Sequence, residues 1–219
     1  MTNTIIKTDQ LSYSANDKNI LKNISFQVKE GDLITISGPS GSGKSTLLKL
    51  IANMIRPTSG DIYFNDKKID LYSSTDYRKE VSYFFQNPVL FGETVRDNLT
   101  FPYEIRNLSF DEPKATSLLE SVKLTSDYLN KSIDSLSGGE KQRIAFVRNL
   151  LFQPKVLLLD EVTSALDHEN RQIIYDIIHS LNQNNQITIL WVTHNEEEFL
   201  SSSQQLIIDN GMIKEDINE

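Results

Sequence analysis

The sequence has no cysteine, no run of basic residues and no apolar run long enough to span a membrane. Without cysteine the chain forms no disulfide, binds no metal through thiolates and uses no cysteine nucleophile, which is compatible with a reducing compartment. The longest purely apolar runs, such as Val156–Leu159, are strand-sized, whereas a spanning helix needs about 20 such residues. Met1–Asp9 lacks the basic and apolar regions of a signal peptide. We therefore expect a protein that is soluble or peripheral to a membrane.

The overall charge and composition narrow the class further. The net charge is −8, and a nucleic-acid backbone attracts clustered lysine and arginine, so we expect no nucleic-acid partner. Hydrophobic residues make up 38% and charged residues 24%, which is typical of a globular chain. A length of 219 residues suits one domain with an inserted subdomain.

A glycine-rich stretch follows the short β-branched run Leu33–Ile36 and fits the pattern G-x-x-x-x-G-K-[ST] at every defined position. Behind it, apolar residues recur at helical spacing: Leu47, Leu48, Leu50, Ile51 and Met54. Strand, loop and helix in this order let backbone N–H groups surround a phosphate, while Lys44 adds charge and Ser45 can ligate Mg²⁺. The alternative is a turn that merely caps a helix. The phosphate-binding candidates are Gly38, Pro39, Ser40, Gly41, Ser42, Gly43, Lys44, Ser45 and Thr46.

Elsewhere in residues 4–152, the predicted elements are first strands and then helices. Residues 4–13 and 20–28 predict an antiparallel hairpin, and shorter strands are expected at 61–64 and 81–85. From about 87 to 136 the pattern turns helical, broken by Pro102 and Pro113, which predicts an inserted helical subdomain. A further helix is expected from Ser137 to about Phe152.

Strands and helices then alternate to the end of the chain. We expect strands at 156–159, 187–192 and 206–208 and helices at about 168–181 and 195–200. Alternation of this kind predicts a largely parallel sheet with ligands at the carboxyl ends of its strands. Just past such ends lie Gly38, Gln86, Asp160 and His194, so we expect them along one rim.

Two adjacent carboxylates at one strand end suggest two separate roles, metal binding and general base catalysis. Asp160 can hold Mg²⁺ directly or through water, the alternative being a cap on the next helix. Glu161 is the candidate general base that polarises an attacking water.

For the other candidate site residues, the sequence pattern alone allows two interpretations. Ser137–Gly139 is either a second anion receptor at a helix start or, with Glu140, a capping box. His194 either donates to a terminal phosphate or is structural, and Gln86 either ligates Mg²⁺ or simply ends a strand. Tyr13 either stacks on a base or is an ordinary strand aromatic.

Taken together, six segments resemble, in order and spacing, the motif set of the ATP-binding cassette (ABC) ATPases, and the resemblance covers essentially the whole chain. They are Gly38–Thr46, Gln86, Leu136–Arg143, Val156–Glu161, Ser164–Asp167 and His194. The resemblance implies one nucleotide-binding domain of α/β class over residues 1–219. Its P-loop NTPase core would comprise 1–86 and 154–219, with a mostly parallel sheet and an N-terminal antiparallel β subdomain, and the α-helical subdomain with its signature motif would lie at about 87–153.

The same resemblance implies a role for each candidate, with ATP and Mg²⁺ as the bound groups. Tyr13 would stack on adenine, Lys44 and Ser45 would bind phosphate and Mg²⁺, Gln86 would bind Mg²⁺ and couple domains, and Asp160 would complete the metal site. Glu161 would be the base, His194 the γ-phosphate sensor and Asp167 a dimer contact. Ser137, Gly138 and Gly139 would bind the γ-phosphate of ATP held by the opposite subunit.

The resemblance also implies a homodimer of cassettes with ATP at the interface, docked on an integral membrane transporter subunit at the cytoplasmic face. Because the sequence has one P-loop and one signature without an internal repeat, two complete sites require two chains. Val162 replaces a common proline, and Ser126–Ser135 lacks a run typical of multidrug exporters. Gln86–Asn107 and Leu190–His194 are similar to bacterial iron-export cassettes. The alternatives are a soluble ABC ATPase acting on nucleic acid or the ribosome, and a P-loop small-molecule kinase.

Overall fold

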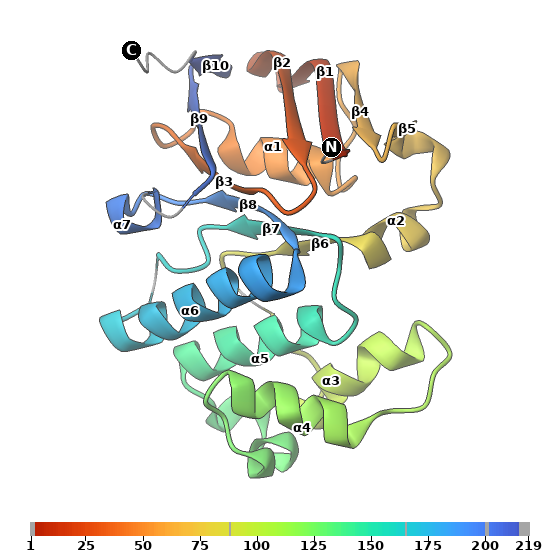
Figure 1. Cartoon of the computed structure of the whole chain (residues 1–219), viewed down its shortest axis with the longest axis vertical. Coiled ribbons are helices and arrows are strands. Elements are labelled where there is room, and N and C mark those ends of the chain that lie inside the picture. Colours follow the sequence, from red (N-terminus) through yellow and green to blue (C-terminus); the bar gives the residue numbers. More distant parts are fainter. Residues whose placement is uncertain (1–2, 88, 165, 200–201, 215–219) are drawn as a thin grey trace.

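A computed structural model describes residues 3–87, 89–164, 166–199 and 202–214 (Figure 1). An antiparallel sheet lies at one end of the molecule, with strand order β2-β1-β4-β5. Its strands are β1 (Thr4–Ala15), β2 (Lys18–Lys29), β4 (Ser59–Phe64) and β5 (Lys67–Lys68). The tight turn at Asn16 and Asp17, both with positive φ, joins β1 to β2 and confirms the expected hairpin.

The second sheet has the order β10-β9-β3-β8-β7-β6, and all its pairs are parallel except β9 with β10. Its strands are β3 (Leu33–Ser37), β6 (Val81–Phe84), β7 (Val156–Asp160), β8 (Thr188–Val192), β9 (Gln204–Asp209) and β10 (Met212–Lys214). The central strands β7 and β8 are buried throughout, as expected of parallel strands covered on both faces. The α/β class and the mostly parallel sheet are confirmed.

Helices cover both faces of this sheet. They are α1 (Lys44–Ile51), α2 (Ser74–Glu80), α3 (Val95–Glu104), α4 (Glu112–Ser121), α5 (Gly138–Leu150), α6 (His168–Asn185) and α7 (Glu196–Phe199). Short 3₁₀ helices span Ile69–Leu71, Ser126–Asn130 and Ile133–Ser135. Helix α1 lies between the two sheets, and α5 and α6 lie on the opposite face of the parallel sheet (Figure 1). Among the described residues, no helix combines the length and apolarity that crossing a bilayer demands.

Helix α5 contributes to two cores at once. Ala145 and Phe146 pack with α6 and the parallel sheet, whereas Ile144 and Val147 pack with α3 and α4. The helical region therefore has a core of its own yet is fixed to the sheet by one shared helix. The domain boundaries near 87 and 153 stay a prediction.

Two expectations about local structure are wrong. Pro102 does not interrupt its helix but lies buried in the last turn of α3, where the missing proline N–H costs one bond, to the carbonyl of Asn98. Met54 does not continue the buried face of α1, because the helix ends at Ile51, Asn53 adopts positive φ and Met54 is 40% exposed. Ala165, within the motif segment Ser164–Asp167, and Leu200, at the end of the helix expected at 195–200, lie outside the described residues.

Candidate functional site

The glycine-rich loop after β3 is packed so tightly that two of its glycines cannot carry a side chain. Gly38 has φ +138°, and a Cβ there would lie 1.9 Å from the carbonyl oxygen of Ile208. Gly43 has φ +108°, and its Cβ would lie 2.6 Å from Leu21 Cδ2. The backbone can therefore follow this path only with glycine at both positions.

The loop surrounds a buried cation. Lys44 Nζ donates to the carbonyl oxygens of Gly38 (2.8 Å) and Pro39 (3.0 Å), and the side chain is 5% exposed. Burial lowers the pKa of Lys44, while the charges of Glu161 and Asp160 raise it. The Ser42 hydroxyl is buried without a hydrogen-bond partner among the described residues, and no side chain caps α1 at Gly43. A buried cation beside unsatisfied donors suits an anionic phosphate group.

Asp160, the last residue of β7, faces this loop. Its Oδ1 accepts from the Ser45 hydroxyl (2.7 Å) and its Oδ2 from the Tyr83 hydroxyl (2.5 Å). Burial, followed by the bond to Asp160, raises the pKa of Tyr83, so this hydroxyl stays protonated and donates. The Asp160 carboxylate and the Ser45 hydroxyl form an oxygen donor pair at the phosphate site, which is the ligand type that Mg²⁺ prefers.

Glu161 points its carboxylate to a different set of partners. Gln86 Nε2 donates to Glu161 Oε2 (3.2 Å), and His194 Nε2 lies 3.2 Å from Glu161 Oε1. Glu161 has φ +51°, a conformation that costs a non-glycine residue about 1–3 kcal/mol. Its N–H is held by the carbonyl of Val192 (3.0 Å) and its own carbonyl accepts from the Ser164 hydroxyl (2.9 Å). The backbone is thus fixed so that adjacent carboxylates diverge.

The signature segment starts α5 with a capping box. The Ser137 hydroxyl accepts from the Glu140 N–H (3.3 Å), and the Ser137 N–H donates to Glu140 Oε2 (2.7 Å). The hydroxyl of Tyr128, then the Ser137 N–H, lower the pKa of Glu140 to about 2. The capping interpretation is confirmed. The anion-receptor interpretation, for Ser137, Gly138 and Gly139, stays a prediction, and the two are compatible.

The predicted site residues fall into two groups. One group lies together at the P-loop: Lys44, Ser45, Gln86, Asp160, Glu161 and His194. The other group is Asp167, which caps α6, and the nearby signature segment Ser137–Gly139. Within the described residues no hydrogen bond or ion pair joins Asp167 or the signature segment to the P-loop. Tyr13, paired with Leu21 and partly buried against the core, likewise has no such bond to the loop in the described part of the chain.

Three residues that contact the predicted site residues were given no role of their own from the sequence. Tyr83 holds Asp160, Ser164 contacts both Gln86 and the Glu161 carbonyl, and Asn170 contacts Asp167. A hydroxyl-bearing aromatic three residues before Gln86, in a strand ending at the same rim, is the signal that points to Tyr83. Nothing local marks Asn170, because its second contact lies on another helix.

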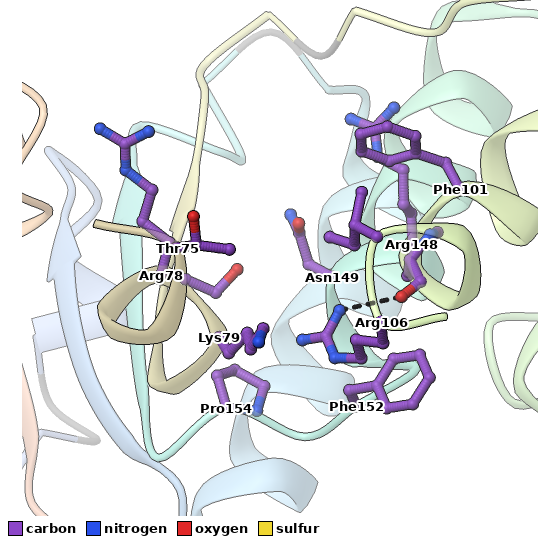
Figure 2. Close-up of a pocket in the computed structure, with 12 residues that line it drawn as sticks. Thr75, Arg78, Lys79, Phe101, Arg106, Arg148, Asn149, Phe152 and Pro154 are labelled. Carbon is purple, nitrogen blue, oxygen red and sulfur yellow. Dashed lines mark hydrogen bonds between the residues drawn. The ribbon is translucent and has the colours of Figure 1, made fainter. Parts of the chain in front are cut away.

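A groove of about 400 Å³ opens between α2 on one side and α3 and α5 on the other (Figure 2). Figure 2 shows Arg78 and Lys79 across from Arg106, Arg148 and Phe152. An adjoining groove of about 470 Å³ shares Arg78, Phe101 and Arg148 and adds exposed apolar side chains, among them Met54, Phe85, Val89 and Phe91. This surface, which we call the α2–α5 groove, is apolar with cationic edges.

Comparisons with known proteins agree with this geometry. The sequence profile of the ABC transporter family matches residues 21–164. The chain belongs to this family. It is therefore an ATP-binding ATPase cassette. Over 194 residues it is 47% identical to the probable iron export ATP-binding protein FetA of Escherichia coli, covering 89% of this chain and 86% of that protein. It is 40% identical to the spermidine/putrescine import ATP-binding protein PotA of Mycoplasma mycoides, covering 96% of this chain but 60% of that relative.

Solved structures resemble this cassette closely. A dimeric ATP-binding cassette in a post-hydrolysis state, bound to ADP and phosphate, superposes with a TM-score of 0.85 at 27% identity, covering 96% of this chain and 97% of that one. An ATP-bound bacterial exporter of the Atm1 family gives 0.87 at 26% identity, covering 98% of this chain and 39% of that one. The expected fold and family are confirmed.

Proposed function

We propose that this cassette hydrolyses ATP as the nucleotide-binding subunit of a bacterial transporter, with Glu161 as the general base. The observation that carries the assignment is the divergence of two adjacent carboxylates at one strand end. Asp160 is engaged by Ser45 and Tyr83, whereas Glu161 is held by Gln86 beside His194. Asp160 is thus placed to bind a cation, while Glu161 is placed to accept a proton from a water molecule.

In this mechanism Lys44 and the loop N–H groups bind the phosphates, and Ser45, Asp160 and Gln86 would hold Mg²⁺. When bound, Mg²⁺ neutralises charge on the β- and γ-phosphates. Glu161 accepts a proton from the water that attacks the γ-phosphate in line, and His194 donates a hydrogen bond to that phosphate. Tyr13 is assigned to the adenine ring, so its place in β1, ahead of the hairpin turn, is the position to test for stacking.

Replacing Glu161 with glutamine tests the assignment. Glu161→Gln keeps the bonds to Gln86 and His194 geometrically possible but removes the base, so turnover should fall by about 10²–10⁴-fold with ATP affinity retained. Glu120→Gln on the exposed face of α4 is the matched control and should leave turnover unchanged. Phosphate release and equilibrium nucleotide binding measure the two quantities. Near-normal turnover of Glu161→Gln would remove Glu161 from the role.

Two copies of the cassette would sandwich ATP head to tail. The signature segment of one copy, Ser137–Gly139, would complete the site of the other, and Asp167 would lie at the contact. The exposed position of Ser137 and Gly138 supports this arrangement. So does the similar solved cassette, which is dimeric and holds ADP and phosphate.

The α2–α5 groove would receive a helix of the membrane subunit, on the cytoplasmic face. Residues in the range 85–106 line it, among them Phe85, Phe101 and Arg106. Arg78, Arg106 and Arg148 donate to backbone carbonyls or to an amide, and among the described residues none forms an ion pair with a carboxylate. Phe152 lies under the Arg106 guanidinium, with 4.2 Å between its ring centroid and the guanidinium carbon. An amphipathic helix with apolar and acidic side chains fits this surface.

Co-purification tests docking. The subunit should retain a membrane protein with several apolar spans of about 20 residues. Ile105→Ser, in the groove, should weaken retention, whereas Leu108→Ser, equally exposed but outside the groove, should not. Bound RNA or DNA instead of a membrane protein would favour a cassette acting on nucleic acid.

For the transported substrate, metal efflux is the best-supported proposal, because the FetA relative is a probable iron exporter. The test is iron release from vesicles that contain the reconstituted cassette and its membrane subunit. Release that needs ATP and is lost in Glu161→Gln supports the proposal. Transport of a polyamine, as the PotA name describes for that relative, without iron release would overturn it.

A further inference from the structure

Asn170 lies in the first turn of α6 and holds both oxygens of the Asp167 carboxylate. Its backbone N–H donates to Asp167 Oδ1 (2.9 Å), which is an ordinary helix cap. Its side-chain amide also donates to Asp167 Oδ2 (2.7 Å). The cap needs only the first of these bonds, so the second fixes the carboxylate in one orientation.

The same side chain reaches the signature helix. The Asn170 Oδ1 accepts from Arg143 Nη1, on the second turn of α5. A Cβ on Gly139 would lie 2.7 Å from Asn170 Cγ, whereas a Cβ on Gly138 would meet nothing within 4 Å. A side chain at position 139 would therefore displace the Asn170 amide from its present position, independently of any phosphate.

These contacts make one bridge between the N-cap of α6, Asp167, and helix α5. The amide uses its NH₂ group for Asp167 and its oxygen for Arg143, so neither can shift without straining the other. The charge of Arg143 adds to the Asn170 bonds in lowering the pKa of Asp167, which keeps this carboxylate ionised. Sequence distance gives no hint of the bridge, because Arg143 and Asn170 are 27 residues apart.

We propose that Asn170 is a positioning residue that sets the Asp167 loop against the signature segment, so that both meet the partner cassette as one rigid surface. The inference rests on the proposed ATP-sandwiched dimer. It concerns the dimer contact alone, because in the described part of the chain Asn170 has no hydrogen bond to the P-loop. Loss of the bridge should thus weaken ATP-driven dimerisation while nucleotide binding by a single chain persists.

The experiment uses the full chain with Glu161→Gln as background, which should hold ATP with strongly reduced turnover. Asn170→Ala keeps the backbone cap and removes the bridge. Asn170→Asp keeps the size, the backbone cap and the acceptor for Arg143, but it loses the side-chain amide donor and its carboxylate repels that of Asp167. Each should weaken the ATP-bound dimer by about tenfold or more, the effect expected when one or two bonds to charged groups are lost. Asn184→Ala, at the exposed far end of α6, is the matched control.

Sedimentation with ATP measures the dimer, and fluorescent-nucleotide binding at low protein concentration measures the single chain. Weakened dimers of both Asn170 variants, with nucleotide affinity within about twofold of the background and a normal Asn184→Ala dimer, support the proposal. Dimers of unchanged strength overturn it and leave the proposed function intact. If the Glu161→Gln background itself fails to dimerise with ATP, the sandwich dimer is overturned and this inference with it.

Discussion

Two helices of this chain begin at glycine-rich loops, and they treat their first N–H groups differently. The N-cap of helix α1 is Gly43, which has no side chain and so provides no side-chain cap. The N-cap of helix α5 is Ser137, whose capping box with Glu140 uses the backbone N–H groups of both residues. The first helix start is open for an anion, while the second is stable by itself before any ligand arrives.

The N-termini of α1 and α5 also differ in burial and packing. The α1 loop has its own buried cation, Lys44, and its glycines are required by close backbone packing. The α5 loop is exposed at Ser137 and Gly138, and Gly138 borders open space. They also lie on opposite faces of the parallel sheet. The α1 loop thus has the features of an anion receptor within one chain, whereas the exposed α5 start would act as one only in the dimer proposed above.

The sharpest test of this comparison is the loss of the buried cation. Lys44→Ala removes the charge from the α1 loop, so ATP affinity should fall by about 10–100-fold, as for a lost charge-assisted bond. Lys49→Ala, in the last turn of the same helix, is the matched control. Equilibrium nucleotide binding gives both values. An unchanged affinity of Lys44→Ala would mean that this loop is not the receptor.

Replacing one glycine with alanine in each loop, before α1 and at the start of α5, compares how tightly the two loops are packed. Gly43→Ala forces a side chain against Leu21 at φ +108°, so the free energy of unfolding should fall by about 1–3 kcal/mol. Gly138→Ala has open space and sits in the first turn of a helix, so the change should stay within about 0.5 kcal/mol of zero. Urea denaturation measures both. Equal losses would contradict the claim that only the α1 loop is tightly packed.

The smallest effect concerns the α5 cap and depends on pH. Because the pKa of Glu140 is lowered to about 2, its ionised form stabilises the fold above its ordinary pKa of 4.5, and this contribution is lost as the pH falls toward 2. Glu140→Gln should therefore lower the free energy of unfolding at pH 7 by about 1 kcal/mol or less, since solvent screens the site. The difference from wild type should shrink below pH 4.5.

Urea denaturation at pH 7 and pH 3.5 checks this, with Glu120→Gln as the control. A difference that grows on acidification would show that the carboxylate does not stabilise the cap in its ionised form.

Much of the site follows from local patterns. The order of strand, loop and helix around Gly38–Thr46, the capping box at Ser137 and the carboxylates after Val156–Leu159 were all predicted and are present. Each depends on residues within a few positions of one another, where backbone geometry is dictated by spacing alone. The end of α1 and the proline in α3 were predicted wrongly, because burial and a left-handed residue outweighed helical spacing.

The sequence by itself thus indicated that the chain binds a nucleotide triphosphate, and it predicted Asp160 for the metal and Glu161 for the attacking water. Only the tertiary structure decided which side chains hold them. Tyr83 reaches Asp160 across 77 positions because β6 is paired with β7, and Asn170 meets Arg143 because α5 and α6 pack on one face of the sheet. Such contacts arise from strand order and helix packing, which no local spacing encodes.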